Sequence, residues 1–197
     1  MHALQDGLNA TFYVLLPVLA QAFGLSYTQV GILRGLNNGA MMCLEIPSGL
    51  LAERLGARTL LVFGLVAAGF GYLVLAGGEG FWLACVCLTV VGVGGAFQHA
   101  LSASIVSAAY PGAAGRTAFG TYNAAGDAGK LAFSGMFSFA VGLGVAWPLI
   151  VGSFGLFALI GAAMLFFVLR RAGAGDRPER PVRASRGEGL GWGVLDL

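Results

Sequence analysis

Ionisable side chains lie inside apolar stretches that are long enough to cross a lipid bilayer, and this feature limits the fold most. Five such residues interrupt these stretches: Asp6, Arg34, Glu45, Asp127 and Lys130. A charge at the centre of a bilayer costs roughly 2.5–3.5 kcal/mol on insertion scales, so such residues usually face a polar cavity or a partner charge. The stretches are therefore expected to be transmembrane helices that enclose a polar path.

The composition is that of an integral membrane protein. The chain is 57% hydrophobic and 10% charged, whereas soluble domains average about 25% charged residues. A transmembrane helix needs about 20 apolar residues, and six segments meet this requirement. They lie near residues 3–23, 28–52, 59–77, 81–107, 117–141 and 147–169. We therefore predict an all-α membrane protein with a six-span unit over residues 1–170.

The basic residues of the connecting segments predict the orientation. Every second connection is basic and contains Arg54, Arg58, Arg116, Arg170 or Arg171, whereas the other connections contain no Lys or Arg. The positive-inside rule then places both termini in the cytoplasm, with the chain in the plasma (bacterial inner) membrane. Residues 171–189 are rich in Arg, Pro, Gly and Glu and are expected to be a disordered cytoplasmic linker. Residues 190–197 read as the truncated start of a seventh span.

The spans repeat as polar, polar, apolar. Polar side chains gather on four of them: His2, Asp6, Asn9 and Tyr13 on the first, Arg34, Asn38 and Glu45 on the second, Gln98, His99 and Ser102 on the fourth, and Asn123, Asp127 and Lys130 on the fifth. An odd number of spans in each repeat predicts two inverted three-helix repeats. The first, second, fourth and fifth spans are expected to line a cavity, and the third and sixth to face lipid.

The connection between the second and third spans carries a family motif. The segment Gly49-Leu50-Leu51-Ala52-Glu53-Arg54-Leu55-Gly56-Ala57-Arg58 resembles the cytoplasmic signature of the major facilitator superfamily, G-x-x-x-(D/E)-(R/K)-x-G-x-(R/K). The resemblance implies a gate motif formed by Gly49, Glu53, Arg54, Gly56 and Arg58, in which the acid latches the cytoplasmic side against the second half of the transporter. Glu53 stands where most members have Asp, and its longer side chain predicts a weaker latch.

Further stretches are similar to the fosmidomycin-resistance-like branch of that superfamily. They are His2-x-x-x-Asp6, Leu15-Leu16-Pro17, Gln98-His99 and Asn123-x-x-Gly126-x-x-Gly129. Ala100 stands where the branch often has Pro, and Lys130 is unusual against that pattern. Members consist of two six-span halves. The resemblance therefore implies an N-terminal half that needs a second six-helix half in trans, or a homodimer, and it implies efflux.

The candidate substrate and proton path contains Asp6, Asn9, Arg34, Glu45, His99, Asn123, Asp127 and Lys130. Asp127 and Lys130 are neighbours on one helical face, either as a structural ion pair or as a pair that proton or substrate opens. Asp6 and His2 are expected near the cytoplasmic end of the first span, either as a solvated helix end or as proton-titratable groups. The second span carries Gly31, Gly35 and Gly39, which predict close packing against another helix.

Three function classes follow from these patterns. The first is a secondary transporter of a small-molecule substrate, with the proton gradient as the candidate driving force. The second is a non-transporting membrane fragment or regulatory interaction partner. The third, a membrane enzyme, is disfavoured because the spans contain no acid pair, no metal-ligand cluster and no nucleophile–base spacing. The lipid bilayer is the expected environment, and no nucleic acid, metal or cofactor is expected.

Overall fold

Every regular element in the described part of the chain is an α-helix. The computed structural model describes residues 1–175, apart from the side chains of His99, Ala100 and Ala113. The helices are α1 (His2–Phe23), α2 (Tyr27–Leu55), α3 (Ala57–Ala76), α4 (Phe81–Ala96), α5 (Gln98–Ala109), α6 (Ala113–Gly142) and α7 (Trp147–Ala172). Most of the predicted 171–189 linker and the whole predicted 190–197 segment lie outside the described residues. The all-helical prediction is confirmed for residues 1–175.

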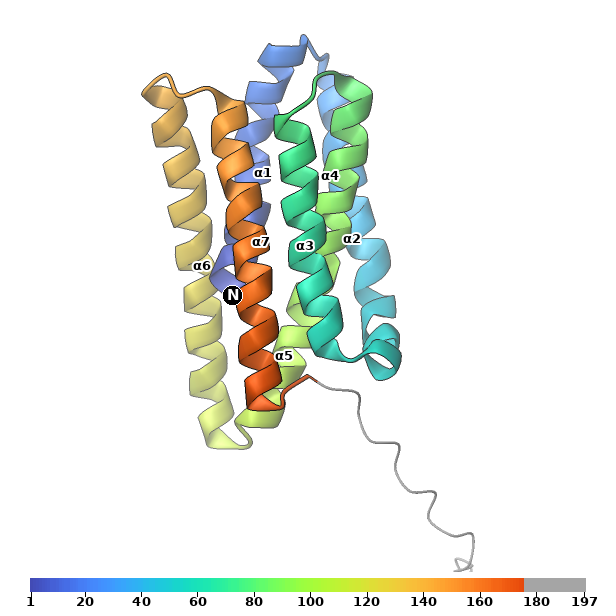
Figure 1. The fold of residues 1–197 in the computed structure, drawn as a ribbon, viewed down its shortest axis with the longest axis vertical. Helices are drawn as coiled ribbons and strands as arrows, with labels where there is room; N and C mark the ends of the chain where they lie inside the picture. Colours follow the sequence, from blue (N-terminus) through green and yellow to red (C-terminus); the bar gives the residue numbers. More distant parts are fainter. Residues whose placement is uncertain (176–197) are drawn as a thin grey trace, which may run out of the picture.

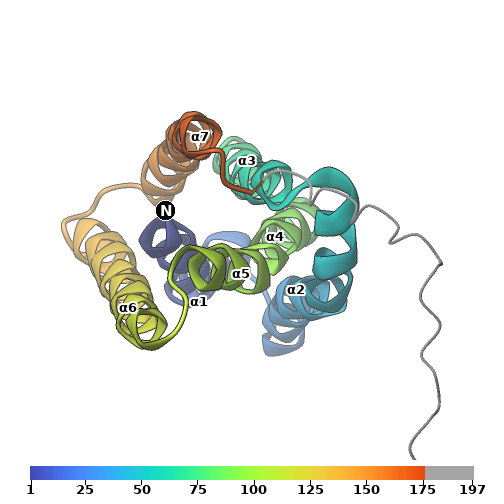
Figure 2. The same ribbon diagram turned by 90° about the horizontal axis from the view of Figure 1, so that it is seen from below.

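The helices form one bundle and run along its long axis (Figure 1). Seen from below, α1 and α4 lie toward the middle, and α2, α6 and α7 lie at the periphery (Figure 2). The most extensive packing joins α1 to α6, α2 to α4, and α3 to both α4 and α7. By contrast, α6 and α7 are consecutive in the chain but make few contacts with each other. The α1–α6 contact brings charged residues of the two helices together.

The core combines leucine packing with buried hydrogen bonds between helices. Its centre holds fully buried side chains such as Leu8, Leu65 and Tyr72. The Tyr72 hydroxyl donates to the Leu8 carbonyl at 2.7 Å, which joins α3 to α1. The Asn37 side-chain amide donates to the Leu88 carbonyl at 2.8 Å, which joins α2 to α4. These bonds satisfy polar groups that could not bond to water inside the bundle.

Within the described residues, three helical stretches are long and apolar enough to cross a membrane by length and composition. They are α3, the stretch Phe81–Ala109 formed by α4 and α5, and α7. The five ionisable residues of the predicted spans lie on the other long helices, α1, α2 and α6. The apolar helices therefore identify an integral membrane protein, and the polar residues gather on one group of helices.

Two features of the helices add detail to the predicted spans. The predicted span 81–107 lies within the apolar stretch Phe81–Ala109, which has a turn at Phe97 between α4 and α5. Gly92, Gly94 and Gly95 occupy the last turns of α4, and glycine weakens a helix interior by roughly 0.5–1 kcal/mol relative to Ala. In addition, the glycine face of α2 packs against no described helix, because nothing lies within 4 Å of a Cβ placed at Gly31, Gly35 or Gly39. That face is open.

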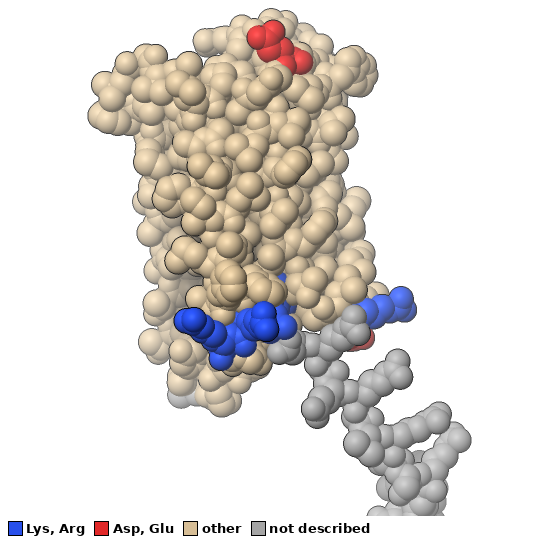
Figure 3. Space-filling model, viewed as in Figure 1, with Lys and Arg blue, Asp and Glu red and all other residues tan. Residues whose placement is uncertain are grey.

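Basic side chains gather at one end of the bundle. Figure 3 shows Lys and Arg at the lower end, whereas an acidic side chain lies at the opposite end. The last turn of α2 contains Arg54, and the last turn of α7 contains Arg170 and Arg171. The positive-inside rule predicts that the connections with these arginines lie in the cytoplasm. The lower end of the bundle is therefore the end that the sequence predicts to face the cytoplasm.

Candidate functional site between α1 and α6

A chain of charges crosses the contact between α1 and α6. The Nζ atom of Lys130 on α6 lies 3.2 Å from Oδ2 of Asp6 on α1. The same Nζ donates a hydrogen bond of 3.0 Å to Oδ1 of Asp127, one turn earlier on α6. The contact between Asp127 and Lys130 confirms the one predicted from their spacing. The contact between Asp6 and Lys130 joins two helices, and the sequence did not predict it.

Burial differs sharply along this charge chain. The side chain of Asp6 is 3% exposed, whereas those of Lys130 and Asp127 are 48% and 72% exposed. An isolated carboxylate in such a buried place would carry a large desolvation cost, and a hydrogen-bonded cation offsets that cost. Lys130 therefore connects a buried acid to the open side of α6.

His2 extends the charge chain on the inner side. Its Nδ1 atom lies 3.5 Å from Oδ1 of Asp6. Its ring stacks on the ring of Tyr122 from α6, with centroids 3.7 Å apart and planes 6° apart. The sequence did not predict this contact; the available signal was the place of Tyr122 one turn before Gly126 on the same helix.

The expectation of a solvated helix end at His2 and Asp6 is wrong. Both residues are buried, at 8% and 2% exposure, and the first turn of α1 lies near the middle of the bundle's height (Figure 1). They are buried because α6 passes directly over this turn.

Glycines bring α1 and α6 together at this point. A Cβ placed on Gly126 would lie 2.5 Å from Nε2 of His2 and 2.7 Å from Oδ2 of Asp6. A Cβ on Gly129 would lie 2.6 Å from the carbonyl carbon of Ala3. Close backbone approach of this kind is typical of small residues at helix contacts in membranes. The motif Gly126-x-x-Gly129 therefore fixes the distance across which Lys130 reaches Asp6.

A second polar cluster lies between α1 and α2. The guanidinium carbon of Arg34 lies 5.4 Å from the ring centroid of Tyr13. The Tyr13 hydroxyl donates to Oδ1 of Asn38 at 3.5 Å. Arg34 and Glu45 are both exposed. Arg34 therefore joins a cluster of its own, apart from the charge chain.

The remaining predicted path residues are separate from the α1–α6 charge chain. Asn9 is half-buried and faces α4, where a Cβ on Gly95 would lie 3.3 Å from its side-chain amide. Asn123 is exposed on α6. His99 lies on α5, and its side chain is outside the described part of the structure. The path predicted from the sequence therefore corresponds to several polar groups on four helices.

The gate motif forms the turn between α2 and α3. Gly56 has φ 83° and ψ 140°, a conformation that favours glycine. The Arg58 amide donates to the Gly175 carbonyl at 2.8 Å, and the Arg58 guanidinium lies 6.0 Å from the Phe166 ring centroid. Glu53 and Arg54 are exposed, as is Gly49 earlier on α2. The turn is therefore held by α7 and by the residues just after it, while Glu53 stays accessible.

The chemistry available at the α1–α6 charge chain is proton exchange and ion-pair exchange. Asp6 accepts from Lys130 on one side and lies beside the imidazole of His2 on the other. Protonation of Asp6 would remove its attraction for Lys130, which could then pair with Asp127 alone. Within residues 1–175, no group of three or more His, Cys, Asp or Glu residues could hold a metal ion.

Comparison with known proteins identifies one family. A family model described as the Major Facilitator Superfamily matches residues 1–195. The tetracycline resistance protein, class G, of Vibrio anguillarum is 34% identical over 109 residues, which cover 54% of this chain and 28% of that protein. The multidrug resistance protein MdtH of Cronobacter sakazakii is 31% identical over 110 residues, which cover 53% of this chain and 27% of that protein.

A third relative has the same kind of match. The uncharacterized MFS-type transporter YfnC of Bacillus subtilis is 29% identical over 98 residues, which cover 50% of this chain. The chain matches between 24% and 28% of the length of these three relatives.

Proposed function

Because the chain belongs to the Major Facilitator Superfamily, we propose that it is one six-span half of a secondary transporter for a small solute. The superfamily and the three apolar helical stretches support membrane transport as the class of function. Two of the relatives are named for drug resistance, which supports efflux as the direction. The narrower fosmidomycin-resistance-like assignment stays a prediction from the sequence motifs.

The helix contacts support the two-repeat architecture. In two repeats, α1 would correspond to α4 and α5 taken as one span, α2 to α6, and α3 to α7. The contact between α1 and α6 in one repeat order then corresponds to the contact between α4 and α2 in the other. The contact of α3 with α7 maps onto itself. All three pairs are among the most extensive in the bundle, which agrees with an inverted repeat. The exchange does not preserve the extensive contact of α3 with α4, because α7 and α1 make few contacts with each other.

The buried carboxylate of Asp6 carries the proposal of proton coupling. Asp6 pairs with Lys130, and Lys130 in turn pairs with the exposed Asp127. In the proposed cycle, a proton on Asp6 frees Lys130 to turn toward the open side of α6, and loss of that proton draws Lys130 back. The proton and the solute would then compete through one ammonium group.

An open face on α2 supports the need for a second six-helix bundle. The Cβ positions of Gly31, Gly35 and Gly39 face open space, and Arg34 and Glu45 are exposed beside them. Exposed charges on a membrane helix are costly unless they face a polar cavity or a partner. We infer that this face lines the solute cavity opposite a second bundle, which is a second copy of the chain or a separate half.

Drug sensitivity of cells that express the chain tests this function. A drug-hypersensitive bacterial strain would carry the wild type, Asp6→Asn, or Glu79→Gln as a matched control in the α3–α4 connection. Growth would be measured against tetracycline and fosmidomycin, with the amount of chain in the membrane measured alongside. The wild type and Glu79→Gln are expected to raise the inhibitory concentration at least fourfold, and Asp6→Asn to leave it at the level of the empty vector.

Two results would count against the proposal. Equal protection by Asp6→Asn and the wild type would remove Asp6 from coupling. Unchanged sensitivity of cells that hold the wild-type chain in their membrane would contradict efflux by the chain alone and favour a non-transporting or regulatory role.

A further inference from the structure

The polar cluster between α1 and α2 presents hydrogen-bond donors at the open face of α2. The guanidinium carbon of Arg34 lies 5.4 Å from the centroid of the Tyr13 ring. The Tyr13 hydroxyl donates to Oδ1 of Asn38 at 3.5 Å. Because Oδ1 accepts this bond, the Asn38 amide can donate its two N–H groups to another acceptor. Arg34 and Tyr13 are exposed, and Asn38 is half-buried.

Arg34 differs from Lys130, the other cation of the predicted spans, in its charged partners. Lys130 contacts the carboxylates of Asp6 and Asp127. Among the described residues, by contrast, no carboxylate forms an ion pair with Arg34. Glu45 shares its face of α2 but lies eleven residues further along, which is about 16 Å along a helix. Arg34 therefore has an aromatic contact but no counter-charge within residues 1–175.

We propose that the cluster of Arg34, Tyr13 and Asn38 binds the anionic group of a small organic solute, such as a carboxylate. The proposal rests on the transporter function proposed above and names the class of its solute, an organic anion. A guanidinium presents N–H donors in one plane that match the two oxygens of a carboxylate. The Asn38 amide, one turn further along α2, adds donors beside it. An organic anion would also compete with a carboxylate for the ammonium of Lys130.

The depth of the cluster favours a solute over a lipid headgroup. Tyr13 lies ten residues before the end of α1 at Phe23, and Asn38 lies eleven residues after the start of α2 at Tyr27. These separations correspond to about 15–17 Å along a helix, or about half of a hydrocarbon core of about 30 Å. A headgroup would have to leave the membrane surface to reach the cluster, whereas a solute in a polar cavity would not.

Glu45 of a second copy of the chain would not supply the missing counter-charge. Copies that insert in the same orientation hold corresponding residues at the same depth. Glu45 of the second copy would therefore stay about 16 Å from Arg34 along the membrane normal. In a homodimer, the guanidinium of Arg34 would remain available to the solute.

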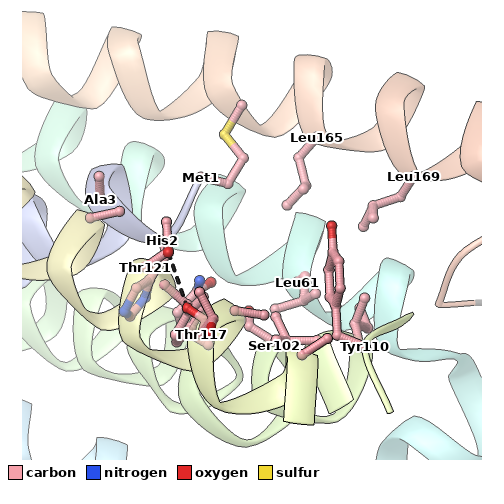
Figure 4. Close-up of a pocket in the computed structure, with 17 residues that line it drawn as sticks. Met1, His2, Ala3, Leu61, Ser102, Tyr110, Thr117, Thr121, Leu165 and Leu169 are labelled. Carbon is pink, nitrogen blue, oxygen red and sulfur yellow. Dashed lines mark hydrogen bonds between the residues drawn. The ribbon is translucent and has the colours of Figure 1, made fainter. Parts of the chain in front are cut away.

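The cluster is separate from the surroundings of the α1–α6 charge chain. Figure 4 shows the pocket beside that chain, and none of the residues that line it belongs to the cluster. Asp6 lies seven residues before Tyr13 on α1, which is about 10 Å along a helix. Variants of the cluster therefore leave the proposed proton site in place.

Two probes of the same shape test the requirement for a negative charge. Anthracene-2-carboxylate is an anion, and anthracene-2-carboxamide replaces the carboxylate by an uncharged amide of nearly the same size. The purified full chain in phosphatidylcholine nanodiscs would be titrated with each probe. Binding would be followed by fluorescence anisotropy, with the signal of empty nanodiscs subtracted. We expect saturable binding of the carboxylate, at least tenfold tighter than that of the amide, in keeping with hydrogen bonds to a charged group.

Charge variants locate the site. Arg34→Gln removes the cation and should weaken binding of the carboxylate probe at least tenfold, whereas Arg34→Lys keeps the charge and should retain part of the binding. Arg116→Gln removes the same charge from an exposed position at the start of α6 and should leave binding unchanged. Asn38→Asp places a carboxylate one turn from Arg34 and should abolish the preference for the anionic probe.

Three results would overturn the proposal. The first is equal binding of the two probes by the wild type, which would leave Arg34 to a carboxylate of the second bundle. The second is equal binding of the anionic probe by Arg34→Gln and Arg116→Gln. The third is displacement of this probe by phosphatidylglycerol in the nanodiscs but not by benzoate in solution, which would make the cluster a headgroup site.

A second variant and the growth assay keep these outcomes distinct. If Arg34→Gln fails to insert into the membrane, Asn38→Asp decides the location of the site. Intact drug resistance of the wild type without a preference for the anionic probe would reject the anion site alone. A preference for the anionic probe without drug resistance would reject the transport function alone.

Discussion

The close approach of α1 and α6 predicts that Gly129→Ala destabilises the bundle, whereas Gly135→Ala on the same helix does not. A Cβ at Gly129 would overlap the backbone of Ala3, whose carbonyl carbon and Cα would both lie at 2.6 Å. Nothing lies within 4 Å of a Cβ at Gly135. Because backbone atoms cannot rotate aside as a side chain can, the two helices would have to separate.

The expected change in stability of each variant is the sum of two opposing contributions. Overpacking costs about 1–3 kcal/mol, and a contact with backbone belongs at the upper end of that range. Replacing Gly by Ala in a helix gains about 0.8–1 kcal/mol, and both variants share this gain. Gly129→Ala should therefore lose about 2 kcal/mol of stability, and Gly135→Ala should gain up to about 1 kcal/mol.

Thermal unfolding of the two variants in mild detergent, followed by circular dichroism, measures the difference. About 3 kcal/mol between them corresponds to a difference in Tm of about 6–12 °C for a chain of this size. Equal Tm values would refute the close α1–α6 contact and, with it, the distance across which Lys130 reaches Asp6.

Two further predictions concern single polar groups. Tyr72→Phe removes the buried hydrogen bond to the Leu8 carbonyl and should lower the free energy of unfolding by about 1 kcal/mol in the same assay. The control Tyr27→Phe, at a side chain that is 99% exposed, should leave it unchanged. Equal effects of the two variants would contradict the hydrogen bond between α1 and α3. Asp127→Asn leaves the contact between Asp6 and Lys130 in place, so the chain should insert normally but lose drug resistance in the growth assay, and unchanged resistance would remove Asp127 from the mechanism.

Much of the fold could be predicted from local patterns. The length of the apolar segments correctly predicted a helix near each span. The spacing of Asp127 and Lys130 correctly predicted their contact. The motif around Gly56 lies in the turn between α2 and α3, which is the connection that the sequence predicted between the second and third spans. These features depend on residues close together in the sequence, where helical periodicity decides the geometry.

Contacts between distant segments could not be predicted in the same way. The Asp6–Lys130 pair and the His2–Tyr122 stack join residues more than 100 positions apart, and periodicity within one helix does not say which helix lies opposite. For the same reason, the sequence left a solvated helix end as one of two alternatives for His2 and Asp6. The turn at Phe97 inside the span 81–107 was not predicted, because apolar length does not show where a helix is interrupted within a span.

The composition of the complex in the membrane tests the central claim most directly, namely that this chain is one half of a two-bundle transporter. The measurement is native mass spectrometry of the full chain, extracted from the membrane in its lipid surroundings and identified subunit by subunit. The account predicts two six-helix bundles in equal amount, either two copies of this chain or this chain with a separate half. A chain that is monomeric under these conditions, with no second bundle present, would contradict the account.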